Sequence, residues 1–171
     1  VNMDPAISSA RAAALCKGIP LVNFCRDDDP GIDYETGMEE LLDYLWRFGH
    51  RRIGVIELQN RYKQYDEGLE DPCVRSMKRI CRDNDAPLEE ERILSGEGVF
   101  ETGYAFAPRF VELGATAIFT GNDLCAAGVL AWAHEHDVAI PDQLSLVGFD
   151  DSNLAVAVSP ALTSIQIPFA E

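Results

Sequence analysis

The chain has 171 residues, which is enough for one domain with a sizeable buried core. Its composition, 47% hydrophobic and 25% charged, is ordinary for a soluble globular protein, and no apolar run approaches the roughly 20 residues that cross a bilayer. The formal net charge of −15 repels phosphate backbones. We therefore expect neither membrane insertion nor nucleic-acid binding by this segment itself.

The five cysteines bear on the compartment in which the protein works. Their number is odd, they form no C-x-x-C pair, and each lies in an apolar stretch. This usage is typical of buried thiols in a reducing cytoplasm. Residues 1–5 lack the basic and then apolar layout of a signal peptide, and position 1 is not methionine. We predict a cytoplasmic protein of which this chain is an internal part.

Apolar periodicity predicts helices that alternate with short strands. In the first half of the chain the predicted helices are 6–17, 35–48 and 69–81, and the predicted strands are 19–24, 53–56 and 92–95. In the second half the predicted helices are 101–113 and 122–136, and the predicted strands are 117–120, 144–149 and 163–167. Gly49 supplies a helix stop, and Pro108 should bend the helix that contains it.

This alternation predicts an α/β fold with a parallel sheet and helices on both faces. Ligands bind such sheets outside the carboxyl ends of the strands, so the polar residues that follow each strand matter most. Two such segments are 120–123 and 150–153. Either Asn122 or Asp123 is expected to cap the following helix, which leaves the other able to face a ligand. For Asp150 two alternatives stay open, a capping or turn role and a ligand contact.

The residues around these segments form an ordered series of short motifs. The series is GIPLV at 18–22, FGHRRI at 48–53, GE at 96–97, TGY at 102–104, AIFTGNDL at 117–124, AG at 127–128, IPD at 140–142, LVGFDD at 146–151 and LTSI at 162–165. In this order and spacing it resembles the ligand-sensing part of the lactose/galactose-repressor (LacI/GalR) family of bacterial transcription regulators. The resemblance extends over nearly the whole chain.

The resemblance implies a type I periplasmic-binding-protein-like fold, in which two α/β lobes enclose a small effector. Residues 1–26 would be the C-terminal piece of the N-lobe, 27–163 the C-lobe, and 164–171 a crossing strand back toward the N-lobe. The loop at 26–32 is shorter than the family pattern. The implied function is effector sensing and dimerisation, with operator DNA bound through a helix-turn-helix segment outside this chain. The implied effector is a sugar or a related metabolite.

The family's effector site matches this chain at three positions. By the resemblance, Asp150 is the carboxylate that accepts hydrogen bonds from ligand hydroxyls or amines, and Asn122 is an amide that contacts the ligand. Phe169 matches an aromatic residue near the last crossing. Planar polar groups beside an apolar ring suit a sugar.

Three other positions depart from the family pattern. Cys25 stands where many members have an aspartate, and Gly98 stands where an aromatic residue is usual. Gly68 falls at the position of a ligand-binding arginine, for which Arg61 is the expected substitute. These departures indicate a different, larger or less polar effector, or a weakened site.

The helix that follows Asn122 has an apolar surface formed by Ala126, Val129 and Trp132. Core packing is one interpretation of these residues. The resemblance implies the other, a two-fold homodimer interface.

Other residue patterns point to simpler roles. His134 and His136 are two apart on a helix, so they cannot share a metal ion. The basic stripe Arg75, Lys78, Arg79 and Arg82 is expected to be an exposed helix face or a contact patch.

No phosphate loop, nucleophile elbow or zinc motif is present in the sequence, so we expect no enzyme activity and no cofactor. The alternative function is a sugar-binding protein of a transport system, which uses the same fold. The five cysteines argue against it. The sequence upstream of Val1 would distinguish the two.

Overall fold

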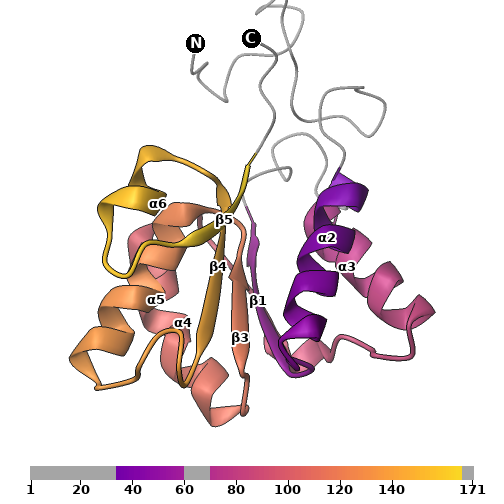
Figure 1. Cartoon of the computed structure of the whole chain (residues 1–171), viewed down its shortest axis with the longest axis horizontal. Helices are drawn as coiled ribbons and strands as arrows, with labels where there is room; N and C mark the ends of the chain where they lie inside the picture. The colour runs from indigo at the N-terminus through magenta and orange to yellow at the C-terminus, as the bar shows by residue number, and fades with distance from the viewer. Residues whose placement is uncertain (1–33, 60–69, 167–171) are drawn as a thin grey trace, which may run out of the picture.

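A computed structural model of the chain describes residues 34–59 and 70–166. The helices are α2 (Tyr34–Arg47), α3 (Pro72–Asp83), α4 (Phe100–Glu112), α5 (Asp123–Glu135) and the short α6 (Asn153–Ala157). The strands are β1 (Ile53–Leu58), β2 (Ile93–Gly96), β3 (Ala117–Thr120), β4 (Ser145–Asp150) and β5 (Thr163–Gln166), with a 3-10 turn at Glu90–Arg92 before β2. Every element predicted within the described residues is present (Figure 1).

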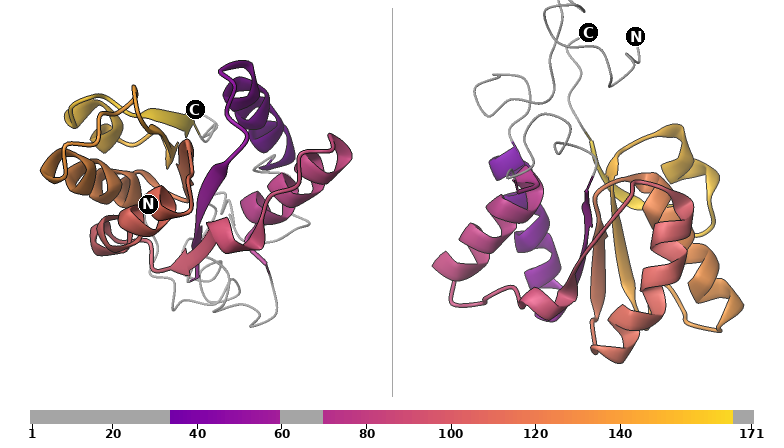
Figure 2. Two further views of the ribbon diagram at one scale, coloured as in Figure 1. Left: turned by 90° about the horizontal axis from the view of Figure 1, so that it is seen from below. Right: turned by 180° about the vertical axis from the view of Figure 1, so that it is seen from behind.

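The five strands form one parallel sheet in the order β2-β1-β3-β4-β5. Helices α2 and α3 cover one face, and α4, α5 and α6 cover the other (Figures 1 and 2). Alternate residues of β1 supply the two cores, because neighbouring side chains of a strand point to opposite faces. Val55 belongs to the core under α2 and α3, and Ile56 to the core under α4 and α5. The predicted doubly covered parallel sheet is therefore confirmed.

Helix α3 begins later than its apolar pattern predicted. The prediction extended the helix through Pro72, whereas the structure begins it at that residue, with Asp71 as the N-cap. Proline has no backbone N–H to donate and a φ already suited to a helix, so it fits the first turn. The carboxylate of Asp71 accepts from the backbone N–H of Cys73 at 2.8 Å, which satisfies one of the free donors at this end.

Two further features differ from, or add to, the predicted elements. Helix α6 was not predicted, because five residues are too few to show a helical period. Pro108 lies inside α4, which continues to Glu112; the bend expected there stays a prediction.

Within residues 34–59 and 70–166, no helix is both long enough and apolar enough to cross a membrane.

Helices α4 and α5 pack through glycines at close range. A side chain at Gly103 would overlap the carbonyl group of Cys125, and one at Gly128 would overlap the carbonyl group of Phe100. Each helix therefore presents a glycine to the backbone of the other. This close approach positions the first turn of α5, and with it the residues that follow β3.

Candidate functional site

Two of the predicted site residues, Asn122 and Asp150, lie at one edge of the sheet. Strands β3 and β4 are neighbours and run parallel, with Phe119 opposite Val147. Their carboxyl ends therefore lie side by side. Asn122 follows the end of β3, and Asp150 is the last residue of β4. Asp150 is also paired with Gln166, at the end of β5. The structure thus brings together the two polar segments that the sequence singled out.

Asn122 is the N-cap of α5. Its Oδ1 accepts from the backbone N–H of Cys125 at 2.8 Å, which confirms the capping interpretation for this residue. Its Nδ2 also donates to the carbonyl oxygen of Gly98 at 3.0 Å. A Cβ at Gly98 would lie 2.9 Å from that nitrogen, so this hydrogen bond leaves no room for a larger residue. The departure at Gly98 therefore has a local structural reason.

Asp123 is buried within the protein. Its side chain is 1% exposed, and the carboxylate accepts from the backbone N–H of Ser152 at 2.7 Å and from its Oγ at 2.8 Å. The other carboxylate oxygen accepts from Ser164 Oγ at 2.6 Å. Sequence reasoning missed these contacts because the two serines lie 29 and 41 residues away along the chain.

The end of β4 has an unusual backbone conformation. Asp150 has a φ of 106° and Asp151 a φ of 47°, both in the region that non-glycine residues rarely adopt. The backbone N–H of Asp151 donates to Ser164 Oγ at 3.1 Å, which helps to hold this conformation. Such strained residues cluster at ligand sites, where the surrounding structure over-determines them.

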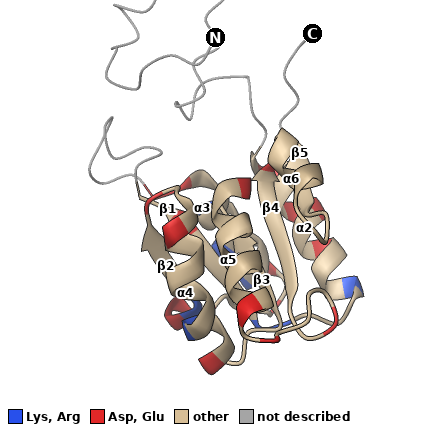
Figure 3. Cartoon of the chain, turned by 90° about the vertical axis from the view of Figure 1, so that its left-hand side faces the viewer, with Lys and Arg blue, Asp and Glu red and all other residues tan. Residues whose placement is uncertain are grey.

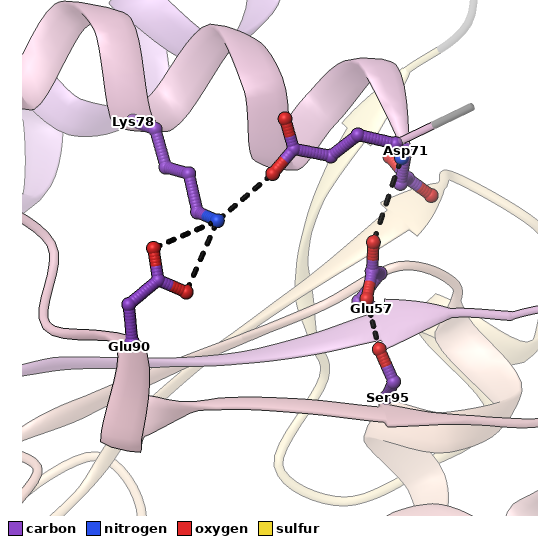
Figure 4. A network of polar contacts seen from close by, with 6 residues as sticks. Glu57, Asp71, Lys78, Glu90 and Ser95 are labelled. Carbon is purple, nitrogen blue, oxygen red and sulfur yellow. Dashed lines mark hydrogen bonds and ion pairs between the residues drawn. The ribbon is translucent and has the colours of Figure 1, made fainter. Parts of the chain in front are cut away.

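A second polar group lies at the carboxyl end of β1, on the face covered by α3 (Figure 4). Glu57 accepts hydrogen bonds from Ser95 Oγ and, at 3.5 Å, from the backbone N–H of Asp71. Sequence reasoning missed Glu57 because it lies within an otherwise apolar strand. The available signal was its position two residues after Val55, which puts both side chains on the same face of the sheet. Acidic residues are spread over several helices and loops of the described part of the chain (Figure 3).

Two residues of the basic stripe of α3, Lys78 and Arg79, form ion pairs with neighbouring carboxylates. Lys78 Nζ lies 2.8 Å from Glu70 and 2.9 Å from Glu90, and Arg79 forms an ion pair with Glu35 of α2. Burial lowers the pKa of Lys78, but its hydrogen bonds and charge interactions with Glu70 and Glu90 raise it more. These pairs favour the exposed-face interpretation over a contact patch for acidic partners.

The residues predicted for a dimer interface are part of the chain's own core. Ala126 and Val129 are 0% exposed and Trp132 is 8% exposed, all in the core beneath α4 and α5. A partner subunit could not reach Ala126 or Val129 in this arrangement, so the core-packing interpretation replaces the interface one. Helix α5 is apolar almost all round, so its sequence did not reveal which side faces solvent.

The histidines and cysteines have structural roles. The ring of His136 stacks on Trp132, and no group of metal-binding side chains occurs within the described residues. Cys73, Cys81 and Cys125 are buried thiols outside any disulfide, as predicted, and burial raises the pKa of Cys81 to about 11.

A cavity of about 480 Å³ lies at the opposite, amino edge of the sheet. Tyr44, Phe48 and His50 line it together with residues that begin β4 and β5. His50 Nδ1 lies 3.0 Å from Thr116 Oγ1, and burial lowers the pKa of this histidine. The cavity is thus separate from the predicted effector site.

Four other residues that the sequence singled out lie outside the described residues: Cys25, Arg61, Gly68 and Phe169.

Comparison with known proteins agrees with this fold. A family model described as a periplasmic binding protein-like domain matches residues 42–171. The HTH-type transcriptional regulator GalR of Streptococcus thermophilus is 29% identical over 138 residues, which are 79% of this chain and 41% of that protein. The chain spans less than half the length of the curated relatives it matches, and these relatives are transcriptional regulators rather than enzymes.

Solved structures give the same result. A regulatory protein of the LacI family from Chloroflexus aggregans superposes with a TM-score of 0.74 at 31% identity, covering 92% of this chain and 58% of that chain. A sugar-binding transcriptional regulator of the LacI family from Escherichia coli, complexed with phosphate, superposes with a TM-score of 0.69 at 27% identity, covering 80% and 48%. The chain therefore belongs to the periplasmic-binding-protein-like domain family, in the form found in LacI/GalR transcription regulators.

Proposed function

We propose that the chain is the C-lobe of the effector-binding domain of a cytoplasmic transcription regulator, and that the effector is a neutral sugar or a related polyhydroxy metabolite. The observation that supports this most directly is the position of Asn122 and Asp150 at the ends of adjacent strands, with Asp150 in a strained conformation. Carboxylate and amide groups at this edge suit the hydroxyls of a sugar. The similarity to a sugar-binding regulator at 27% identity is consistent with this class of ligand.

In the proposed mechanism Asp150 accepts hydrogen bonds from the effector. Asn122 has one Nδ2 hydrogen left after it binds Cys125 and Gly98, and this hydrogen is the donor that it can offer. Effector binding would favour one closure state of the two lobes and so change the spacing of two DNA-binding segments. DNA binding itself would belong to a helix-turn-helix segment encoded upstream of Val1; an upstream sequence without one would contradict the regulator assignment.

Replacing Asp150 with alanine is expected to weaken sugar binding by about 100-fold, because hydrogen bonds to a charged acceptor are worth about 1.5–3 kcal/mol each. The measurement is calorimetric titration of the full-length protein with D-glucose, D-galactose, lactose and cellobiose. Asp142→Ala is the matched control, because Asp142 is an exposed aspartate outside this edge and its removal should leave affinity unchanged. Equal affinities of wild type and Asp150→Ala would show that Asp150 is only a turn residue.

We further propose that the protein is a homodimer and that the interface uses exposed residues of α5 and α6. Leu124 is 44% exposed and Val156 is 77% exposed, and they belong to helices that contact each other. Exposed apolar side chains on two helices in contact suit a self-complementary two-fold contact with a second copy of the chain.

Val156→Asp is expected to convert the dimer to a monomer in sedimentation equilibrium, because it introduces two facing charges into an apolar contact. Val111→Asp is the control, since Val111 is an exposed apolar residue of α4, 41% exposed, and its substitution should leave the dimer intact. A Val156→Asp variant that dimerises as tightly as wild type would contradict the proposed interface.

A further inference from the structure

Asp123 connects three elements at the carboxyl edge of the sheet, where the effector is proposed to bind (the effector edge). It lies in the first turn of α5, and its carboxylate binds Ser152 at the start of α6 and Ser164 of β5. A buried carboxylate is costly unless its oxygens are hydrogen-bonded, and three short hydrogen bonds to a charged acceptor meet this requirement. We call this group, formed by Asp123, Ser152 and Ser164, the serine–aspartate clamp.

The clamp is built against the backbone of β4. A Cβ at Gly148 would overlap Oδ1 of Asp123, so the carboxylate lies directly against the strand at a position where only glycine fits. Ser164 Oγ donates to Asp123 and also accepts from the backbone N–H of Asp151. Both backbone N–H groups that follow Asp150, those of Asp151 and Ser152, are therefore bound by the clamp.

These contacts determine the backbone on the carboxyl side of Asp150. The positive φ of Asp150 and of Asp151 is unfavourable for non-glycine residues, so it needs contacts that hold it. The clamp supplies two such contacts directly after Asp150, and Asp150 is also paired with Gln166 in β5. The hydrogen bond from Asp151 to Ser164 and the pairing of Asp150 with Gln166 thus both connect the end of β4 to β5.

We propose that Asp123 is a positioning residue of the effector site, which acts by holding the 150–152 backbone so that the Asp150 carboxylate is presented to the effector. This inference rests on the proposed effector-contacting role of Asp150. It also assigns a linking role to Ser164, through which the 150–152 backbone and β5 share one hydrogen-bonded group.

The first experiment is a double-mutant cycle in the full-length protein, with D-glucose, D-galactose, lactose and cellobiose as probes. Asp123→Asn replaces one acceptor oxygen with a donor group and is expected to weaken sugar binding about tenfold in the wild-type background. In the Asp150→Asn background it is expected to cause less than about a twofold further loss, because it acts through Asp150. Equal losses in both backgrounds would overturn the proposal, since a general structural defect does not depend on Asp150.

The second experiment tests the clamp without a ligand, by amide hydrogen exchange. Ser164→Ala removes the hydroxyl between Asp123 and Asp151, and we expect the amides of Asp151 and Ser152 to exchange about tenfold faster, with β1 unchanged. Ser164→Thr keeps a hydroxyl and should restore protection. Thr163→Ala is the matched control, because Thr163 is the exposed neighbour on the same strand. Unchanged exchange at 151–152, or a loss spread evenly over the sheet, would overturn the clamp.

The two experiments separate this inference from the proposed function. If wild type binds none of the four sugars, the sugar assignment fails, and the exchange data alone decide whether the clamp holds the 150–152 backbone. If wild type binds a sugar and Asp150→Ala abolishes binding while Asp123→Asn has no effect, the proposed function stands and the positioning role fails.

Discussion

Replacing Gly128 with alanine is expected to lower the free energy of unfolding by about 3 kcal/mol or more, because the added methyl group overpacks a close helix contact. Gly128 lies on α5 where a Cβ would overlap the carbonyl group of Phe100 in α4, and it would also approach the backbone nitrogen of Tyr104. Backbone atoms cannot rotate away as the end of a side chain can. The two helices must therefore separate, and the packing between them must loosen.

The measurement is urea denaturation of wild type and variant, and the change appears as a lower midpoint at an unchanged slope. Gly37→Ala is the matched control within the same chain. Gly37 lies in α2, where the nearest atom to an added Cβ is Ile165 Cγ2 at 3.9 Å. Because alanine is the better helix former, Gly37→Ala should stabilise the protein by about 0.5–1 kcal/mol. A Gly128→Ala variant as stable as wild type would show that α4 and α5 do not approach this closely.

Truncating Phe110 to alanine is expected to destabilise the fold by about 3–5 kcal/mol, the usual cost of removing a buried aromatic ring and leaving a cavity. Phe110 is 0% exposed on α4, and its ring lies over Gly54 of β1 where a Cβ would overlap it. The glycine therefore provides the space that the ring fills. Collapse around the cavity is limited, because Gly54 has no side chain that could move into it.

Phe48→Ala is the control for Phe110→Ala, because the same change is made at a residue that is 69% exposed. Surface substitutions of this kind usually change stability by no more than about 0.5 kcal/mol. Thermal or urea unfolding of the two variants gives the comparison. Equal losses for Phe48→Ala and Phe110→Ala would contradict the placement of the core between α4 and the sheet.

Much of the effector edge was predictable because local patterns define it. Short apolar runs followed by polar residues marked β3 and β4, and the rule for parallel sheets then placed Asn122 and Asp150 at the same edge. The capping role of Asn122 also followed from its position just before an apolar helix. These predictions depend only on residues near one another in the chain.

Other features depend on contacts between distant residues. The partners of Asp123 could not be predicted, because α6 and β5 must first pack beside α5 before Ser152 and Ser164 reach its carboxylate. The exposed side of α5 was likewise hidden, since an almost wholly apolar helix gives no amphipathic signal; the structure buries Ala126 and Val129 and leaves Leu124 exposed.

The sequence by itself determined the family, the parallel α/β architecture and the edge at which the effector is expected. It did so because strand and helix periods, and the motifs between them, are local properties of the chain. Only the tertiary structure decided that Asp123 is buried and bound to Ser152 and Ser164, and that the predicted interface residues are core. Burial and hydrogen bonding at those positions are set by elements that lie far apart in sequence and meet only in the folded protein.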